Sequence, residues 1–258
     1  MSIEHDPLGL LRPDWPVPPG IRCAVTTRAM PGVSRGPHAS CNLGLRNGET
    51  AETVRANRAL LRTALALPCE PLWLHQVHGC DVIDADAIVA AVDPEPRADA
   101  VIARAPGRVL AVLSADCLPV LFAAADGNEI AAAHAGWRGL AAGVLETTIA
   151  ALRTPPARLL AWLGPCIGAV SYEVGAEVRG AFVEPDAGAA AAFVSTRPGH
   201  WTCDLAALAR RRLRTCGVTR IFGGGFDTRS DPRFYSHRRD PAASGRFASL
   251  IWRERAES

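Results

Sequence analysis

Residues 117–139 decide the fold of the central part of this chain, and they read CLPVLFAAADGNEIAAAHAGWRG. Two apolar runs, Leu118–Ala123 and Ile130–Ala133, flank the dipeptide Asp126-Gly127, which is a strong signal for a two-residue hairpin turn. Such a turn pairs residue 125 with residue 128, so the numbers of paired residues sum to 253. We therefore predict an antiparallel hairpin whose register is set by its turn.

This register places Cys117 and His134 on one face of the hairpin. His134 lies opposite residue 119, and residues 117 and 119 point to the same face because side chains alternate along a strand. The two residues are then diagonal neighbours with Cα atoms roughly 7–8 Å apart, which is close enough to share a zinc ion. A cysteine and a histidine are also common in packed cores, so the hairpin alone leaves a core and a metal site equally open.

A third candidate ligand is His78, in His75-Gln76-Val77-His78-Gly79. A metal with three protein ligands keeps a fourth position for water or substrate, as catalytic zinc sites do. We therefore expect a catalytic rather than a structural metal if His78, Cys117 and His134 converge.

The rest of the chain mixes strands and helices. Further strands are predicted at Ile21–Thr26, Val109–Leu113, Leu159–Leu163 and Phe247–Trp252. Helices are predicted at Thr50–Leu67, with Thr50 as its cap, at Leu140–Leu152 and at Leu205–Cys216. Because the strands come in runs rather than in regular alternation with helices, the pattern favours an α+β fold. No repeat or linker divides the chain, so we expect one domain over residues 1–258.

Composition excludes several functions. The net charge of +2 gives no bulk attraction to nucleic acid or to a membrane, and neither is an expected partner. All 28 basic residues are arginine, which excludes Schiff-base chemistry and a lysine phosphate loop. No apolar run reaches ~18 residues and no signal peptide is visible. The eight cysteines contain no C-x-x-C pair, so we expect reduced thiols and a cytoplasmic protein.

Several polar segments are candidates for substrate contacts. Gly136-Trp137-Arg138-Gly139 leads into a helix, where Arg138 and free N–H groups can bind an anion or simply form a tight turn. The stretch 230–240, which includes Arg238, suits an anionic or aromatic group or a solvated loop. A glycine-rich early loop with Arg28 and Asn42 is a weaker candidate for the same cleft. Asp116 is a candidate proton carrier or a turn cap.

Taken together, these segments resemble the multicopper polyphenol oxidase (laccase-like) family, also called the peptidoglycan editing factor family. The better-supported role of that family is zinc-dependent purine nucleoside phosphorylase. The resemblance spans nearly the whole chain through a series of ordered motifs. They are Thr26-Thr27-Arg28, Asn42-Leu43-Gly44, Gln76-Val77-His78-Gly79, Ala115-Asp116-Cys117-Leu118-Pro119, His134-Ala135-Gly136-Trp137-Arg138-Gly139, Gly164-Pro165-Cys166-Ile167-Gly168, Tyr172-Glu173-Val174-Gly175, Asp204-Leu205, Arg238-Arg239-Asp240 and Gly245-Arg246.

The resemblance implies that His78, Cys117 and His134 are the zinc ligands, and that copper can occupy the same site. It also implies layered α/β/β/α architecture with mixed sheets, similar to the catalytic domain of cytotoxic necrotizing factor. Two segments depart from the family pattern, Thr27-Arg28-Ala29-Met30-Pro31-Gly32 and Gly225-Phe226-Asp227-Thr228. These departures concern loop shape and substrate preference rather than the metal ligands.

The resemblance implies phosphorolysis of adenosine, inosine, guanosine or methylthioadenosine to free base and ribose 1-phosphate, together with deamination of adenosine. Zinc lowers the pKa of bound water towards ~7, which suits attack on C6 of a purine. One alternative is a Cys–His hydrolase that edits peptidoglycan precursors, with Cys117 as nucleophile and His134 as base. Another is a copper-dependent phenol oxidase, although seven dispersed histidines do not suit a multicopper cluster. The expected partners are small molecules, a nucleoside and phosphate, and the expected state is a monomer or weak homodimer.

Overall fold

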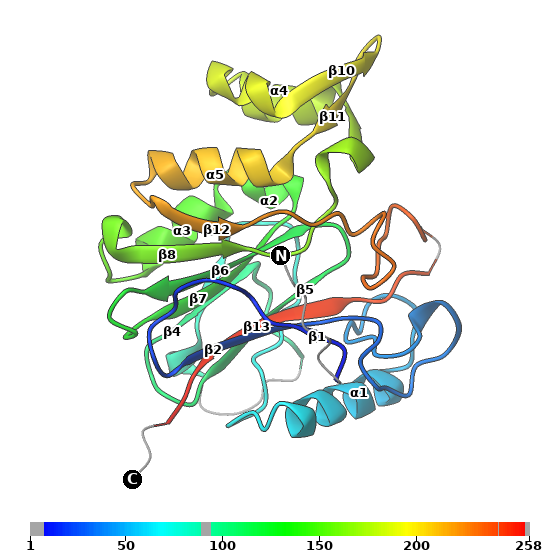
Figure 1. Ribbon diagram of the computed structural model, residues 1–258, viewed down its shortest axis with the longest axis vertical. Coiled ribbons are helices and arrows are strands. Elements are labelled where there is room, and N and C mark those ends of the chain that lie inside the picture. The colour runs from blue at the N-terminus through cyan, green and yellow to red at the C-terminus, as the bar shows by residue number, and fades with distance from the viewer. Residues whose placement is uncertain (1–7, 89–93, 242, 256–258) are drawn as a thin grey trace.

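The fold is layered, with two packed β-sheets between helices (Figure 1). It is described from a computed structural model of the chain that covers residues 8–88, 94–241 and 243–255. The larger sheet has six strands in the order β12-β8-β6-β7-β4-β3. Its strands are β12 (Arg220–Gly223), β8 (Leu159–Leu163), β6 (Leu118–Ala124), β7 (Ile130–Ala135), β4 (Ala100–Ala103) and β3 (Val82–Asp84). Among the described residues, no helix is both long and apolar enough to cross a membrane.

The central hairpin has the predicted register. Strands β6 and β7 pair antiparallel, and Pro119 lies opposite His134. Residues 118–124 of β6 and 130–135 of β7 are all buried, because one face of this sheet packs on helices and the other on the second sheet. The loop is longer than the predicted two-residue turn, because β6 ends at Ala124 and the N–H of Gly127 donates to the carbonyl of Ala124. The pairing of the two strands nevertheless keeps the predicted register, and the register decides which residues share a face.

The second sheet has four strands in the order β1-β2-β13-β5. These are β1 (Leu10–Leu11), β2 (Ile21–Thr26), β13 (Phe247–Arg253) and β5 (Val109–Ser114), and all neighbouring pairs are antiparallel. Its inner face contributes Val25, Val112 and Ile251 to the apolar layer between the two sheets. The chain crosses directly from this sheet to the larger one through residues 115–117, which connect β5 to β6.

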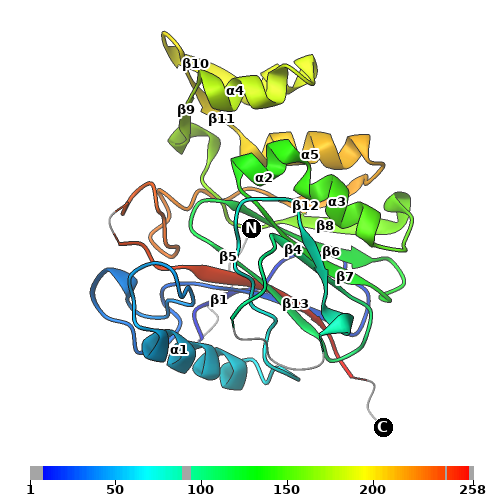
Figure 2. The same cartoon turned by 180° about the vertical axis from the view of Figure 1, so that it is seen from behind.

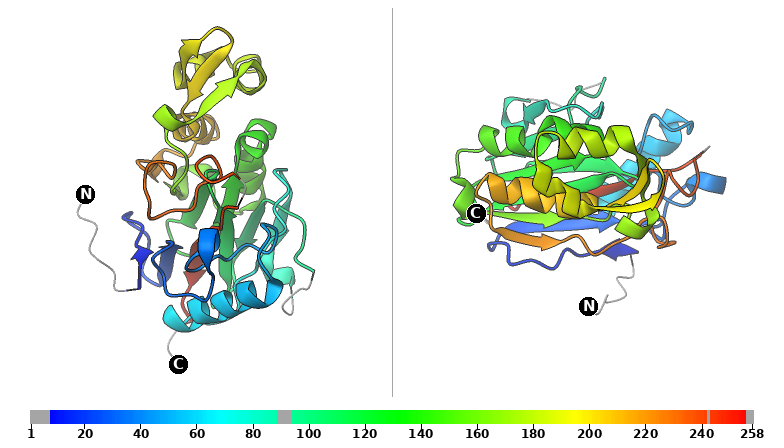
Figure 3. Two further views of the ribbon diagram at one scale, coloured as in Figure 1. Left: turned by 90° about the vertical axis from the view of Figure 1, so that its right-hand side faces the viewer. Right: turned by 90° about the horizontal axis from the view of Figure 1, so that it is seen from above.

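Helices cover the outer faces of both sheets, as Figures 2 and 3 show from behind and from the side. On the larger sheet lie α2 (Trp137–Ala142), α3 (Val144–Ala151) and α5 (Leu205–Thr215). On the smaller sheet lies α1 (Ala51–Ala64), whose Leu61 packs with Leu250 of β13. Helix, sheet, sheet and helix thus follow one another, which confirms the predicted α+β class and the layered order.

A small third sheet extends from this body, at the top of Figure 1. It contains β10 (Phe193–Arg197), β11 (His200–Cys203) and β9 (Glu173–Gly175), with α4 (Ala176–Val183) beside it. Four of the five residues of β10 are exposed, so these strands lack the apolar runs on which strand prediction depends. Short 3₁₀ helices complete the described secondary structure, at Gly36–His38, Ala85–Ala87, Pro156–Arg158, Ala169–Ser171 and Ala187–Ala192.

Two predicted helices differ from those observed. The helix predicted at Leu140–Leu152 is two helices, α2 and α3, because Gly143 adopts φ 102° and its N–H closes α2 on Gly139 and Leu140. The helix predicted at Thr50–Leu67 has the expected cap, since the Thr50 side chain accepts from the N–H of Thr53. It ends at Ala64 rather than Leu67, because Ala66 is left-handed at φ 47°.

Candidate metal centre

His78, Cys117 and His134 converge in the structure. Their ligand atoms all lie within 4.8 Å of one another, and the Sγ of Cys117 is 3.8 Å from the Nε2 of His78. The two imidazole rings meet edge to face, with centroids 4.9 Å apart. His78 is exposed and His134 is buried, so the cluster opens to solvent on the His78 side.

Cys117 is placed by the connection between the two sheets. It directly precedes β6, and its carbonyl accepts a hydrogen bond from the hydroxyl of Ser114 at the end of β5. The preceding residue, Asp116, has a left-handed φ of 91°, which is uncommon for a residue other than glycine. This sharp turn brings Cys117 to the same face as His134, as the hairpin register predicted.

The segment that carries His78 is attached to both sheets. The side-chain amide of Gln76 pairs with the backbone of Leu113 in β5: its Nε2 donates to the carbonyl at 2.8 Å, and its Oε1 accepts from the N–H at 2.7 Å. On the other side, the backbone of His75 exchanges hydrogen bonds with Pro96 and Ala98, just before β4. His78 itself has a left-handed φ of 61°.

Asp99 contacts two of the three candidate ligands. Its carboxylate is fully buried and accepts hydrogen bonds from the N–H groups of Val77, His78 and Gly79 and from the Nδ1 of His134. Asp99 is not among the functional residues predicted from the sequence. The sequence contains one indication of its role, because Asp99 directly precedes an apolar run in Ala98-Asp99-Ala100-Val101. A carboxylate buried beside such a run requires hydrogen-bond donors around it.

The protonation of the cluster follows from these contacts. Burial would raise the pKa of the Cys117 thiol, but the charge and hydrogen bonding of His134 and His78 outweigh burial and lower the pKa to about 6. Burial would lower the pKa of His134, but the Cys117 thiolate and Asp99 outweigh burial and raise the pKa to about 9. A thiolate and an imidazolium therefore face each other near neutral pH in the metal-free protein.

Glycines keep space for the cluster. A Cβ at Gly136 would lie 2.8 Å from the Sγ of Cys117 and 3.0 Å from the Cδ2 of His78. A Cβ at Gly139 would lie 2.9 Å from the carbonyl oxygen of Gly79. The start of α2 thus packs directly against the ligand atoms and against the segment that carries His78.

The donor set fits a zinc ion. Two imidazole nitrogens and one thiolate match the ligands that zinc prefers, and bonds of about 2.0–2.3 Å separate tetrahedral ligand atoms by roughly 3.5 Å. The observed separations of up to 4.8 Å need only small side-chain rotations to reach that value. The Nδ1 of His134 is engaged by Asp99, which leaves Nε2 as the donor towards a metal.

Two of the predicted anion-binding residues, Arg138 and Arg238, are exposed and lie over aromatic rings. Arg138, in the first turn of α2, is exposed, and its guanidinium carbon lies 4.4 Å from the ring centre of Trp137. The guanidinium carbon of Arg238 lies 5.3 Å from the ring centre of Tyr172, and Nη1 donates to the carbonyl of Glu173. Burial raises the pKa of the Tyr172 phenol, and the positive charges of Arg238 and Arg138 oppose this rise.

Asp116 joins the metal cluster to the loop that carries Arg238. Its Oδ1 accepts from the hydroxyl of Thr228 at 2.6 Å, and its Oδ2 accepts from the N–H of Arg238 at 2.6 Å. Both carboxylate oxygens are therefore engaged, which favours a role in holding the loop over the role of a proton carrier. Proton transfer by Asp116 stays a prediction.

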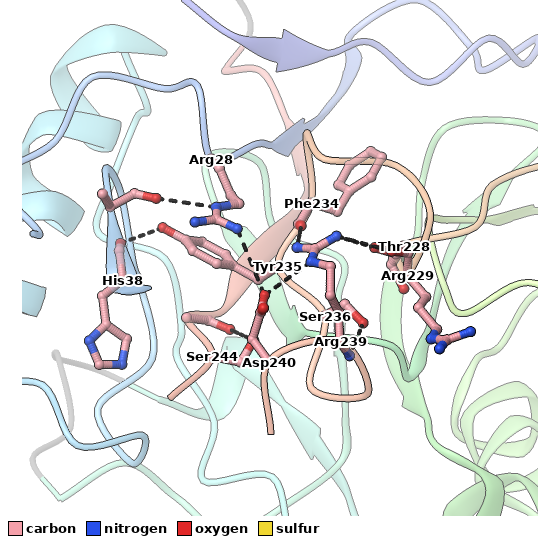
Figure 4. A network of polar contacts seen from close by, with 12 residues as sticks. Arg28, His38, Thr228, Arg229, Phe234, Tyr235, Ser236, Arg239, Asp240 and Ser244 are labelled. Atoms are coloured by element: carbon pink, nitrogen blue, oxygen red, sulfur yellow. Dashed lines mark hydrogen bonds and ion pairs between the residues drawn. The ribbon is translucent and has the colours of Figure 1, made fainter. Parts of the chain in front are cut away.

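The loop of residues 228–240 is ordered by a polar network that also contains Arg28 (Figure 4). The Arg28 guanidinium lies 3.9 Å from the Asp240 carboxylate and 5.0 Å from the centre of the Tyr235 ring, and the Tyr235 hydroxyl donates to the carbonyl of His38. Arg239 donates to Asp240 and to a set of carbonyl oxygens. These oxygens belong to Thr228, Arg229, Asp231 and Phe234.

The predicted substrate residue Asn42 has no solvent-exposed surface. It is fully buried, and its amide pairs with Asn47, Glu49 and Gly44 and accepts from the N–H of Arg246. Both the oxygen and the nitrogen of its side chain are therefore used to shape the loop. A direct contact between Asn42 and a substrate stays a prediction.

Known proteins resemble this chain in sequence and in fold. The family model of the multi-copper polyphenol oxidoreductase laccases matches residues 22–254. The chain is 53% identical over 254 residues to a protein of Xylella fastidiosa named purine nucleoside phosphorylase, covering 95% of this chain and 97% of that protein. It is 48% identical to the Escherichia coli purine nucleoside phosphorylase YfiH, covering 94% and 98% of the two chains.

A solved structure has the same fold. The crystal structure of a Neisseria meningitidis protein superposes with a TM-score of 0.90 at 44% identity, covering 96% of this chain and all of that one. The chain therefore belongs to the multi-copper polyphenol oxidoreductase laccase family, as its motifs predicted.

Proposed function

We propose that this protein is a zinc-dependent purine nucleoside phosphorylase that acts on adenosine, inosine, guanosine and methylthioadenosine. The observation that carries the proposal is the convergence of two imidazoles and one cysteine sulfur. Two exposed arginines belong to segments that contact this cluster: Arg138 follows Gly136, which packs on Cys117, and the N–H of Arg238 donates to Asp116 beside Cys117. The names of relatives that align over nearly the whole chain support the substrate class. The fold alone would not, since one fold can host many activities.

In this proposal His78, Cys117 and His134 hold the zinc ion. When bound, zinc supplies a Lewis acid next to the substrate. Arg138 and Arg238 bind the phosphate, whose oxygen forms the new bond to C1′ of the ribose as the bond from C1′ to the purine nitrogen breaks. The departing base keeps that bond's electron pair and takes up a proton, and the phosphate charge stabilises the positive charge that builds on the sugar ring.

Deamination of adenosine is the second activity that we propose for this pocket. Water adds to C6 of the purine, ammonia leaves, and inosine forms. Since this reaction needs no phosphate anion, the arginines contribute to phosphorolysis alone. An Arg138→Gln variant should therefore lose phosphorolysis and keep deamination.

The experiment that tests the proposal uses zinc-loaded protein with inosine and phosphate, and it measures hypoxanthine and ribose 1-phosphate in equal amounts. Adenosine without phosphate tests the deamination. Cys117→Ser and chelator treatment should each abolish product, and added zinc should restore only the chelated wild type. Absence of base release from the zinc-loaded wild type, or full activity of Cys117→Ser, would refute the proposal.

One observation favours a second candidate, a Cys–His hydrolase that edits peptidoglycan precursors. Asp99, His134 and Cys117 have the order of a nucleophile triad, in which a carboxylate orients an imidazole beside a thiolate. Irreversible inactivation by iodoacetamide at saturating zinc would support the thiol nucleophile. Loss of activity with chelator and its recovery with zinc would support the metal.

The third candidate is copper-dependent oxidation of phenols. Within the described residues, the one group of three or more potential ligands is His78, Cys117 and His134. A multicopper centre needs several metal sites, so we infer that copper binds here only in place of zinc. Metal analysis of protein purified without added copper tests this, and stoichiometric copper would contradict it.

We also propose that residues 1–258 act as one domain and work as a monomer or weak homodimer. The apolar layer shared by the two main sheets supports the first statement. Sedimentation velocity tests the second, and a stable higher oligomer at micromolar concentration would contradict it.

A further inference from the structure

One carboxylate connects two of the three candidate metal ligands. The Oδ1 of Asp99 accepts from the N–H of His78 at 2.9 Å and from the Nδ1 of His134 at 2.8 Å. Its Oδ2 accepts from the N–H of Val77 at 3.0 Å and from that of Gly79 at 2.7 Å. The residue is fully buried, so these four donors replace the water that the charge has lost.

The three backbone donors form an anion-binding nest. Successive N–H groups converge when one residue among them is left-handed, and His78 has a φ of 61°. That conformation is unfavourable for a residue with a Cβ, so it persists only where the surroundings compensate for it. The Asp99 carboxylate supplies the compensation, and the resulting turn directs the His78 imidazole towards the Sγ of Cys117.

The fourth donor sets the chemistry of the other imidazole. A carboxylate only accepts hydrogen bonds, so the Nδ1 of His134 has to carry a proton. The Nδ1 proton of His134 stays on that nitrogen, because it is donated to the Asp99 carboxylate. The Nε2 of His134 is thereby the nitrogen available for coordination.

We propose that Asp99 is a positioning residue of the metal centre, which sets the backbone at His78 and the tautomer of His134 with one carboxylate. This inference rests on the metal site of the proposed function and adds the residue that prepares it. Asp99 does not lie among the metal donors, because both its oxygens are engaged by the four hydrogen bonds.

The substitution Asp99→Asn separates charge from shape. An asparagine has nearly the same size, but it places an NH₂ group where one of the two oxygens was. If NH₂ replaces Oδ2, it faces the N–H groups of Val77 and Gly79 and breaks the nest. If it replaces Oδ1, His134 has to accept at Nδ1, which requires the proton on Nε2 and blocks coordination there. Either orientation damages one ligand.

The test is a zinc competition titration with a chromophoric chelator on the wild type, Asp99→Asn and a matched control. The control is Asp81→Asn, which makes the same chemical change at an exposed residue whose carbonyl accepts the N–H of Asp99. We expect Asp99→Asn to weaken zinc binding 10- to 100-fold, and Asp81→Asn to leave it unchanged. Cobalt substitution gives a second readout, because the thiolate-to-cobalt band should weaken in Asp99→Asn.

A measurement on the wild type alone covers the case in which Asp99→Asn fails to fold. Nitrogen-15 spectra of the zinc-loaded chain should show His134 protonated at Nδ1 and coordinated through Nε2. Coordination through Nδ1, or wild-type zinc affinity in folded Asp99→Asn, would overturn the inference and leave the proposed function standing. A wild-type chain that binds no zinc would overturn both.

Discussion

The contact between Gly136 and the ligand atoms predicts a specific effect of one methyl group. In Gly136→Ala the new Cβ would lie 2.8 Å from the Sγ of Cys117 and 3.0 Å from the Cδ2 of His78. The backbone tolerates alanine, since Gly136 has φ −62° and ψ 158°. The substitution therefore tests the space beside the ligands rather than backbone strain.

The magnitude follows from the overlap. Non-bonded carbon atoms prefer separations of about 3.5–4.0 Å, so the sulfur or the start of α2 has to move by about 1 Å. Metal–ligand distances tolerate only about 0.2 Å, and a misplacement of about 1 Å at a reacting centre costs on the order of 100-fold in rate. We expect zinc affinity to fall at least about 10-fold and kcat/KM by about 100-fold. Gly136 also caps α2, and alanine there costs about 1 kcal/mol of stability.

The assay combines the chelator titration with phosphorolysis of inosine, and thermal unfolding of the metal-free variant measures the cap effect separately. Gly225→Ala is the matched control, because a Cβ at Gly225 meets no atom within 4 Å. Wild-type zinc affinity and activity in Gly136→Ala, with the variant folded, would refute the geometry of the cluster described above.

Three further predictions concern charged residues. Glu129→Gln should lower the free energy of unfolding by about 2 kcal/mol at pH 7, because buried Glu129 accepts several hydrogen bonds. Burial raises the pKa of Glu129, but those hydrogen bonds outweigh burial and lower the pKa in the folded protein. The stabilisation by Glu129 is therefore present above the pKa of the unfolded chain and is lost as the pH falls through the lower pKa of the folded protein. Urea unfolding from pH 7 to pH 3 should show the stabilities of the wild type and Glu129→Gln converging. Asp116→Asn should raise KM for phosphate more than it lowers kcat, because Asp116 holds Arg238 in place. The pH profile of kcat should stay unchanged, and loss of one limb of that profile would instead identify Asp116 as a proton carrier. Glu95→Gln should lower the free energy of unfolding by about 3 kcal/mol, because the buried Arg58 guanidinium loses the carboxylate that pairs with it. Urea unfolding measures this loss, and a loss below about 1 kcal/mol would contradict the role of the ion pair.

The hairpin was predictable because its information is local. An Asp-Gly pair between two apolar runs predicts the observed register, although the loop itself is longer than two residues, and the register sets the relation of Cys117 to His134. The third ligand had no such local rule: His78 reaches the cluster through the Gln76 pairing with Leu113 and through the nest around Asp99. Its place came from the family resemblance.

Other features depend on contacts between distant segments. Asp99 became visible only when its partners at 77–79 and 134 were placed around it. The break between α2 and α3 had a local signal, Gly143, but apolar periodicity on both sides favoured one continuous helix. The strands β9, β10 and β11 escaped prediction because they are exposed or only half-buried for most of their length and pair with one another.

The connection between β5 and β6 has a consequence for how the protein comes apart. Cys117 ends the short crossing between the two main sheets, and the His78 segment is bonded to both of them. An ion held by these residues would tie the crossing to β7 and to the 75–79 segment. Separation of the sheets would then require release of the ion, so the rate of unfolding should fall as metal is added and the sheets should exchange their amide protons together. The metal-bound cluster would thus hold the two sheets together as well as take part in the reaction.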